Sequence, residues 1–519
     1  MSCRFALAIP GIQSLMEIQS TKISWQKKIG PYWLPILIAL IFLVFTFAYY
    51  PFQEKLQFDT DEGLNLMRSM LVTLGHPLYS EVSSDQAPLF NVILALVFRV
   101  VGFNVDAARG LVLLFGTLLV WAGAQFLELT WGKLAAILFL PLIIVAPRYL
   151  NLSVAVMIGV PAISLAAVSL VFVSLWHQKK KSIWLVLSGF LLALSVLIKL
   201  FTGFLAPIFL IGMTLTAYFE AKEKKFSWTF LRPALIWGIS FAGLGLLLGL
   251  VLVGPRNVWE IVYPHLMAPT EKYFQDEGFG INVQLQAAVP LILLGLLGSV
   301  TAIYRRNWLS LYPLAWAAVA YIMFSFYSPV FYHHQLLITV PLAMLAAAGV
   351  GDGIFSLFQA VRASQIIRWE ILFGVLAIAG FILVTSQYAP VVDRELLNRP
   401  RFRASEMDAT SGKLRVIDKM NEYRDQTHWI VTDLPMYAFR VHKPVPPILA
   451  TISQKRLSTG SLTEADILSA MEQYQPEQVL MARFTLPGLE DYLQKNYTLI
   501  YSPEYFRLFL RNDLAQGKP

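Results

Sequence analysis

Charged residues are scarce in this chain of 519 residues, of which only 14% are charged while 56% are hydrophobic. So little charge excludes an ordinary soluble globular protein, in which about a quarter of the residues are charged. It is typical of a protein that crosses a membrane many times, in agreement with a mean hydropathy of +0.59. The aromatic fraction of 13% suits two interfacial belts of aromatic side chains.

Cysteine and common sequence motifs are scarce as well. Cys3 is the single cysteine, so an intrachain disulfide is excluded. The C-terminal quarter lacks a glycine-rich phosphate loop, an HExxH helix, an EF-hand loop and the Cys/His spacing of a zinc site. No cleavage pattern of a signal peptide follows the apolar run 32–50, so this run is expected to remain as the first membrane helix.

The charged residues are unevenly distributed along the chain. Residues 1–388 hold 24 Lys and Arg against 17 Asp and Glu, whereas residues 389–519 hold 17 against 16 at the density of a soluble domain. The sequence therefore predicts a membrane domain over 1–388 and a soluble domain over 389–519, with a polar link at 391–411. The basic excess lies in the membrane part, where it sets topology and does not require nucleic acid.

Long apolar runs predict about eleven transmembrane helices. These runs lie at 32–50, 108–129, 134–147, 153–175, 183–199, 202–219, 234–253, 283–303, 308–326, 333–350 and 371–388. A further run, 88–103, spans about 16 residues and is short for a membrane helix at the usual rise per residue. It also carries Asn91 and Arg99 on one helical face.

Basic loops decide whether 88–103 spans the membrane, because Lys and Arg gather in short cytoplasmic loops. If this run does not span, one set of basic residues becomes cytoplasmic: Lys133, Lys179, Lys180, Lys181, Lys222, Lys224, Lys225, Arg305, Arg306, Arg362 and Arg368. If it spans, all of them become external, so the non-spanning alternative is favoured. We therefore expect a multi-pass protein of the cell (inner) membrane with a cytoplasmic N-terminus and an extracytoplasmic C-terminal domain.

Residues 51–106 then form one long external loop. Two helices lying at the membrane surface are expected in it, at 62–74 and 88–103. Three acidic residues open this loop: Asp59, Asp61 and Glu62. Acidic residues favour helix N-termini, so Asp61 and Glu62 have a structural interpretation as first-turn residues. The alternative is an active site at the membrane surface.

The first external loop carries short motifs in a distinctive order. They are Asp61-Glu62-Gly63, Leu74-Gly75-His76-Pro77-Leu78-Tyr79, Gln86-Ala87-Pro88-Leu89, Gly102 and Ala108-Arg109. This pattern resembles the first loop of GT-C membrane glycosyltransferases, in particular the dolichyl-phosphate-mannose protein mannosyltransferase and aminoarabinose transferase group. The resemblance implies a mainly α membrane bundle with two surface helices in the first loop. It also implies transfer of a sugar from a polyprenyl phosphate to an acceptor on the non-cytoplasmic side.

By this resemblance, Asp61 is the general base that acts on the acceptor, in an inverting transfer, and Glu62 is its acidic partner in the catalytic site. Asp59 is the second candidate for the base, but it fits the motif less well. Phosphate is already a fair leaving group, so the reaction needs a carboxylate for the acceptor and cations for the phosphate. The stretch 153–161 lacks the carboxylate that the family often has there, so a second acid from this stretch is not expected. The catalytic role therefore falls more fully on Asp61 and Glu62. Arg109 is expected to hold the loop in place.

Candidate ligands of the donor phosphate are basic residues at external helix ends and turns, namely Lys199, Arg148, His333 and His334. They have structural alternatives, because a helix-end Lys also snorkels and a His pair beside aromatic residues also anchors a helix at the interface. His265 is a candidate metal or acceptor ligand in an external segment that is otherwise expected to be solvated. No cofactor follows with certainty, a divalent metal remains a candidate, and the donor is expected to be a polyprenyl-phosphate sugar.

The soluble part alternates helical and strand patterns. Helices are predicted at 413–424 and 463–474, and strands at 429–433, 478–481 and 506–510. This pattern predicts a small α/β domain that packs over the active site or guides the acceptor.

Two other functions fit a multi-spanning chain: a lipid or sugar transporter (a flippase), and a non-catalytic relative whose acidic cluster is structural. Transporters often place ionisable residues near the bilayer midplane. Here such residues gather at helix ends and in external loops, which favours chemistry at the membrane surface. The expected partners are the polyprenyl-phosphate sugar, a lipid, glycan or protein acceptor, and membrane lipids, without nucleic acid.

Overall fold

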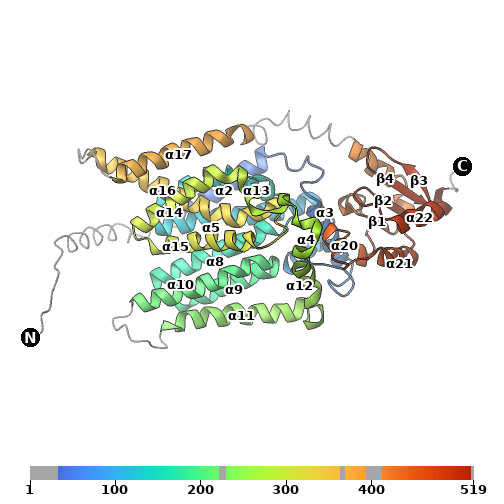
Figure 1. Ribbon diagram of the computed structural model, residues 1–519, viewed down its shortest axis with the longest axis horizontal. Helices are drawn as coiled ribbons and strands as arrows, with labels where there is room; N and C mark the ends of the chain where they lie inside the picture. The colour runs from blue at the N-terminus through green and yellow to red at the C-terminus, as the bar shows by residue number, and fades with distance from the viewer. Residues whose placement is uncertain (1–32, 221–229, 363–368, 393–411, 516–519) are drawn as a thin grey trace, which may run out of the picture.

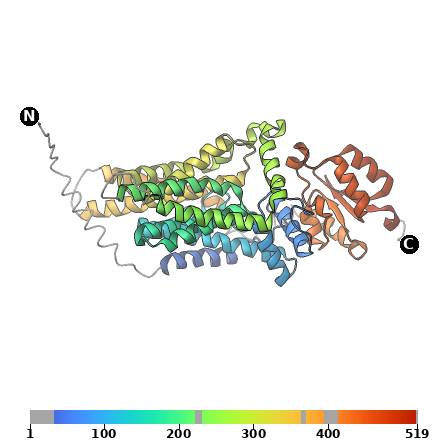
Figure 2. The ribbon, with the colours of Figure 1, turned by 90° about the horizontal axis from the view of Figure 1, so that it is seen from below.

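The computed structural model describes residues 33–220, 230–362, 369–392 and 412–515. A helix bundle forms one end of the elongated molecule and a small domain with a β-sheet forms the other (Figure 1; Figure 2). The first-loop helices α3 (Thr60–Thr73) and α4 (Leu89–Val101) lie where the two parts meet. Cys3, the basic residues at 222–225, Arg368 and most of the predicted link 391–411 lie outside the described residues.

Apolar helices make up the bundle. Within the described residues, eight helices are long and apolar enough to cross a membrane, and four further apolar helices are shorter. The long ones are built on α5 (Val105–Thr130), α8 (Gly159–Lys179), α10 (Leu205–Glu220), α11 (Arg232–Leu252), α14 (Val289–Tyr304), α15 (Leu311–Ser325), α16 (Leu336–Arg362) and α17 (Trp369–Val392). The shorter ones are α2 (Trp33–Tyr49), α4, α6 (Lys133–Ile144) and α9 (Ser182–Ile198). The eight long helices with α2, α6 and α9 match the predicted spans, and α4 matches the surface helix at 88–103.

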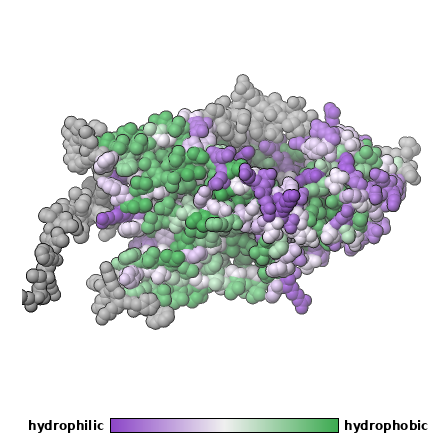
Figure 3. Space-filling model, viewed as in Figure 1, coloured by the Kyte–Doolittle hydropathy of each residue, from purple (hydrophilic) through white to green (hydrophobic). Residues whose placement is uncertain are grey.

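The sides of the bundle expose apolar side chains, whereas the small domain exposes mostly polar ones (Figure 3). On α11, for example, Ile239 is 72% exposed and Val251 is 71% exposed. Water would make such surfaces unstable, but lipid tails solvate them well. The surface therefore agrees with the predicted multi-pass membrane protein.

Short helices complete the end of the bundle that faces the small domain. They are α7 (Tyr149–Leu152), α12 (Val258–Met267) and α13 (Ile281–Leu285). A 3-10 turn at Leu200–Phe204 separates α9 from α10, and another at Tyr332–Gln335 precedes α16. These breaks place Lys199 and the His333-His334 pair at helix ends rather than inside the spans.

The C-terminal domain contains a four-stranded sheet in the order β1-β2-β4-β3. Its strands are β1 (Ile430–Thr432), β2 (Gln478–Met481), β3 (Tyr497–Tyr501) and β4 (Arg507–Arg511). Strands β1 and β2 are parallel, and β4 is antiparallel to both β2 and β3. The helices are 412–421, α19 (Pro435–Arg440), α20 (Gln454–Ser458), α21 (Glu464–Tyr474), α22 (Pro487–Asn496) and α23 (Asn512–Ala515).

Three of the four strands, β1, β2 and β4, match the predicted strands. Strand β3 was not predicted; it is an edge strand with one buried residue, so its side chains do not show the alternation of buried and exposed positions that marks a half-buried strand.

Helix α3 is covered on two sides. Its apolar side packs on the bundle, and α19 of the C-terminal domain covers the other side, so residues 62–71 are all buried. Gly63 makes this approach feasible, since a Cβ there would lie 2.6 Å from the Met436 backbone nitrogen. Phe439 extends the same contact by packing on Phe98 of α4 at 5.5 Å between ring centroids. The C-terminal domain therefore covers the loop that carries the acidic cluster.

Candidate active site

Asp59 is the residue that caps α3. Its backbone is extended, and its Oδ1 accepts a hydrogen bond from the backbone N–H of Asp61 at 2.9 Å. Its Oδ2 accepts a hydrogen bond from the Tyr332 hydroxyl at 2.8 Å. This is standard N-cap geometry. Asp59 is thus the N-cap, and Asp61 and Glu62 lie in the first turn of α3, as their structural interpretation expected.

Glu62 forms a buried ion pair with Arg109 of α5. The two carboxylate oxygens accept from Arg109 Nε at 2.8 Å and from Nη2 at 2.9 Å, and both side chains are fully buried. The same carboxylate also accepts the backbone N–H groups of Phe58 and Val156. Arg109 in turn donates to the carbonyls of Phe52 and Lys55, so it holds the loop in place as expected. This network fully engages Glu62.

Asp61 has different surroundings from its neighbour. The side chain is partly buried, and no hydrogen bond or ion pair engages its carboxylate within the described part of the chain. Burial raises the pKa of Asp61 to about 7, and the negative charges of Asp59 and Asp85 add to this rise while Arg68 and Lys199 oppose it. A carboxylate with free lone pairs and a pKa near neutrality has the properties of a general base.

Lys199 lies at the break between α9 and α10. Its residue is only 6% exposed, and among the described residues its ammonium has neither a hydrogen bond nor an ion pair. The Ser195 hydroxyl donates a hydrogen bond to the Thr202 hydroxyl, which in turn donates to the carbonyl of Lys199. These two hydrogen bonds fix the backbone at the break. A buried ammonium without a partner is costly, so this position favours an anionic ligand.

Three predicted site residues gather around the ring of Phe201. The ammonium of Lys199 lies 5.9 Å from the ring centroid, and the imidazoles of His334 and His265 lie edge-on at 5.3 and 6.1 Å. The Nδ1 of His334 accepts the backbone N–H of Phe331 at 3.0 Å, so in the neutral ring the proton is on Nε2. The ring of His333 lies beside it, tilted, at 4.4 Å between centroids. Residues far apart in the sequence thus bring one ammonium and three imidazoles together.

The remaining predicted residues lie at the edge of this cluster. His265 donates from Nδ1 to the Ile261 carbonyl at 2.8 Å; burial and then the nearby Lys455 lower its pKa. Arg148 is exposed, has a left-handed backbone with φ of 65°, and packs its guanidinium 5.4 Å from the Tyr332 ring. In the described residues, no group of three or more His, Cys, Asp or Glu is arranged to hold a metal ion.

Sequence reasoning missed three charged residues of this region: Arg68 and Asp85, which act on Asp61, and Lys455, which pairs with Asp85. Asp85 forms ion pairs with Arg68 at 3.1 Å and with Lys455 of the C-terminal domain at 2.5 Å. Burial alone would raise the pKa of Asp85, but Lys455 and Arg68 outweigh it and hold that pKa well below its usual range. The motif before Pro88 contained a weak signal for Asp85. Nothing in the sequence pointed to Lys455.

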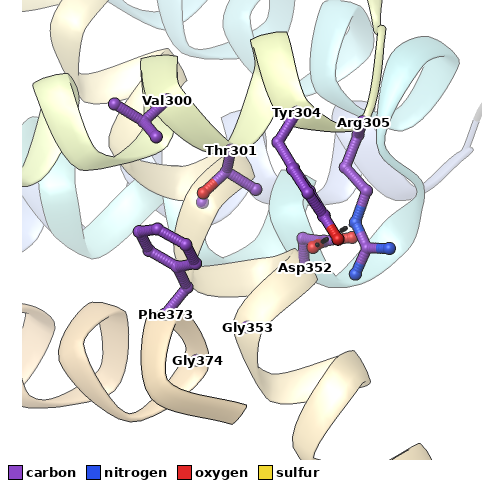
Figure 4. Close-up of a pocket in the computed structure, with 9 residues that line it drawn as sticks. Val300, Thr301, Tyr304, Arg305, Asp352, Gly353, Phe373 and Gly374 are labelled. Carbon is purple, nitrogen blue, oxygen red and sulfur yellow. Dashed lines mark hydrogen bonds and ion pairs between the residues drawn. The ribbon is translucent and has the colours of Figure 1, made fainter. Parts of the chain in front are cut away.

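A separate pocket lies at the opposite end of the bundle, between α14, α16 and α17 (Figure 4). Its lining includes the ion pair between Arg305 and Asp352, with Nε 2.9 Å from Oδ2. The other lining residues are Val300, Thr301, Tyr304, Gly349, Gly353, Phe373 and Gly374. None of the predicted site residues borders this pocket, so it is not part of the candidate active site.

Comparisons with known proteins agree with this architecture. Residues 85–259 match the family described as dolichyl-phosphate-mannose-protein mannosyltransferase. The crystal structure of ArnT from Cupriavidus metallidurans bound to undecaprenyl phosphate superposes with a TM-score of 0.60 at 14% identity, over 92% of this chain and 97% of that one. The chain has the GT-C glycosyltransferase fold. No curated protein sequence matches it.

Two archaeal structures share the GT-C fold. The Archaeoglobus fulgidus oligosaccharyltransferase in the apo form has a TM-score of 0.54 at 14% identity, over 88% of this chain and 70% of that one. AglB from the same organism, in complex with an inhibitory peptide and a dolichol-phosphate, has a TM-score of 0.51 at 14% identity, over 96% and 75%. The predicted resemblance and the predicted fold class are both confirmed.

Proposed function

We propose that the chain transfers a sugar from a polyprenyl-phosphate carrier to an acceptor hydroxyl or phosphate on the extracytoplasmic side. One observation carries this proposal: the carboxylate of Asp61 lies near the buried ammonium of Lys199 at one end of a GT-C bundle, and neither group has a hydrogen bond or ion pair within the described residues. Two proteins of this fold are described with polyprenyl phosphates, ArnT with undecaprenyl phosphate and AglB with a dolichol-phosphate. Their ligands support a lipid phosphate as the donor carrier here.

In this proposal Asp61 is the general base. The acceptor oxygen attacks the anomeric carbon of the sugar, and Asp61 takes the acceptor proton as the new C–O bond forms. The bond between the anomeric carbon and the phosphate oxygen breaks, and the polyprenyl phosphate leaves with the electron pair. A single displacement of this kind inverts the anomeric configuration. The leaving phosphate needs no proton, so the reaction requires a base but no partner acid, and Asp61 can supply that base.

The cluster around Phe201 is suited to bind the donor phosphate. Lys199 offers a positive charge and His334 offers an N–H donor from Nε2. Such preorganised donors stabilise the charge that develops on the leaving group. Tyr332 lies in the turn before α16, and its ring contacts both the imidazole of His333 and the guanidinium of Arg148, which extend the edge of this cluster. Glu62 acts as a positioning residue in this proposal, since its hydrogen bonds fix the first turn of α3 against α5.

The transporter alternative has less support. The buried charged residues on the described helices of the bundle lie at helix ends, as Arg109 and Lys199 do, rather than at mid-span. Alternating access commonly relies on broken helices with ionisable residues near the midplane. This distribution favours a site at the membrane surface over a transport path.

The proposal is tested with purified protein in vesicles that contain undecaprenyl-phosphate sugars and a total lipid and glycan extract from cells lacking the protein. We expect a glycosylated acceptor and free undecaprenyl phosphate in equal amounts, both detected by mass spectrometry. Movement of the intact lipid-linked sugar across the bilayer without an acceptor product would overturn the proposal and support a transporter.

The transfer rate is expected to depend on pH through Asp61. Only the ionised carboxylate accepts a proton, and burial raises its pKa to about 7. The acidic limb of the pH–rate profile, in which the rate falls as the base is protonated, therefore lies at a higher pH than for an ordinary Asp. The rate should fall about tenfold per pH unit below the pKa of Asp61 and level off above it. Initial rates of undecaprenyl phosphate release over a pH series measure this limb. A profile that stays flat below neutrality would contradict the role of Asp61.

Replacing Lys199 with Met is expected to weaken binding of undecaprenyl phosphate. A hydrogen bond to a charged group contributes about 1.5–3 kcal/mol, so the Kd should rise by about 10- to 100-fold. Quenching of tryptophan fluorescence on titration with undecaprenyl phosphate reports this change. Lys181→Met is the matched control, because Lys181 is exposed at the other end of α9. Equal effects of the two substitutions would show that Lys199 does not bind the phosphate.

A further inference from the structure

A charged bridge connects the C-terminal domain to the first loop beside the candidate active site. Lys455 of α20 approaches Asp85 Oδ2 at 2.5 Å, and Asp85 Oδ1 accepts from Arg68 Nη2 of α3 at 3.1 Å. Asp85 is 8% exposed and Arg68 is fully buried. The bridge therefore crosses the boundary between the domain and the membrane part with its central charges removed from bulk water.

Thr451 strengthens this connection from the domain side. Its hydroxyl lies 3.0 Å from Arg68 Nε and 2.7 Å from Arg68 Nη2. Arg456 holds the same segment by donating to the Thr451 carbonyl at 2.9 Å. Arg68 is thus held between a carboxylate of the loop and a hydroxyl of the domain, so the domain position and the charge arrangement are coupled.

Stability alone does not explain a buried bridge of this kind. Desolvation of the charges offsets most of their attraction, and apolar residues of similar size often serve as well or better. Apolar packing is already available at this boundary, where Met436 lies on Gly63 and Phe439 lies on Phe98. The bridge is better explained by what its charges do to the neighbouring site.

The groups that face Asp61 come from several elements. Asp59 and Arg68 belong to α3 and its cap, Asp85 to the loop before α4, Lys199 to the end of α9, and Tyr332 to the turn before α16. The bridge supplies two of these groups. Asp85 raises the pKa of Asp61 and Arg68 lowers it. Lys455 offsets part of the negative charge of Asp85, while the ion pair with Arg68 also favours the ionised form of Asp85.

We propose that Lys455 is a positioning residue of the active site, which acts through Asp85 to close the C-terminal domain over the loop and to set the electric field at Asp61. This proposal rests on the proposed function, because it requires Asp61 to be the base. It assigns to the C-terminal domain a direct part in the reaction, although no atom of that domain reacts.

The two ends of the bridge should shift the pH profile in opposite directions. Lys455→Met leaves Asp85 with less neutralisation, so the acidic limb of undecaprenyl phosphate release should move up by about 0.5–1 pH unit. Asp85→Asn removes a negative charge near Asp61, so the limb should move down by a similar amount. Lys455→Arg keeps the charge and should keep the limb near that of the wild type.

A purely structural bridge gives a different result. Both substitutions would then lower the rate by the same factor at every pH, and the position of the limb would not move. That outcome, or shifts in the same direction, would overturn the proposal. If Lys455→Met is not recovered as folded protein, Lys455→Gln removes the same charge and carries the same expected shift.

Failure of this inference is distinguishable from failure of the proposed function. If Asp61→Asn retains normal transfer, the base is another group and the proposed function is wrong in that respect. If Asp61→Asn is inactive while the variants at Lys455 and Asp85 keep the limb of the wild type, only the inference about the bridge is wrong. Hydrogen exchange in α3 and α20 of each variant reports separately whether the domain stays closed.

Discussion

Asp61→Asn is expected to lower the transfer rate by about 100- to 10,000-fold, which is the range that a general base commonly contributes. Asn has nearly the shape of Asp but cannot accept the acceptor proton. The loss should appear in kcat rather than in donor affinity, since the cluster around Phe201 is unchanged. The measurement is release of undecaprenyl phosphate by the reconstituted protein under saturating donor. No hydrogen bond engages the Asp61 carboxylate among the described residues, so the fold should tolerate the change.

Asp59→Asn provides the matched control for this substitution. Asn is as good an N-cap as Asp, so it should keep the hydrogen bond to the backbone of Asp61 and the start of α3. We expect a rate within about tenfold of the wild type, well above that of Asp61→Asn. A larger loss at Asp59 than at Asp61 would assign the base to the cap residue. Near-normal transfer by Asp61→Asn would remove Asp61 from the mechanism.

The acidic cluster shows what the sequence could predict about the site. A local pattern identified a helix start with adjacent carboxylates, and the helix α3 begins at Thr60 as that pattern suggests. Adjacent helical residues point about 100° apart, so neighbours in the sequence face different surroundings. Glu62 pairs with Arg109 of α5, whereas Asp61 lies near the charges of Asp85, Arg68 and Lys199. Which carboxylate stays free depends on contacts that a local pattern does not contain.

The fold was more accessible to sequence reasoning than the site. Apolar runs report the spans directly because lipid requires continuous apolar surface, and the basic clusters resolved the one ambiguous run at 88–103. The bridge from Lys455 to Asp85 had no such signal, since a single Lys on a soluble domain is usually a solvated surface residue. It became evident only once the domain was seen to cover α3.

The second large effect is expected at the buried pair of Glu62 and Arg109. Glu62→Gln preserves the shape of the side chain but leaves the guanidinium of Arg109 buried without its counter-charge. Removing one partner of a buried ion pair commonly costs about 3–5 kcal/mol of stability. We therefore expect a marked decrease in the free energy of unfolding, measured by titration with a denaturing detergent. Transfer by the fraction that remains folded should fall far less than in Asp61→Asn.

A double-mutant cycle separates the ion pair from the other contacts of Arg109. Arg109→Met should destabilise the protein as well, because it leaves the Glu62 carboxylate buried without its counter-charge and removes the hydrogen bonds from Arg109 to the carbonyls of Phe52 and Lys55. The double substitution removes both charges, so its cost should fall below the sum of the single costs by about 1–3 kcal/mol. Strictly additive costs would show that the pair does not act as a unit. If Glu62→Gln instead left stability unchanged but abolished transfer, Glu62 would be a catalytic residue rather than a positioning one.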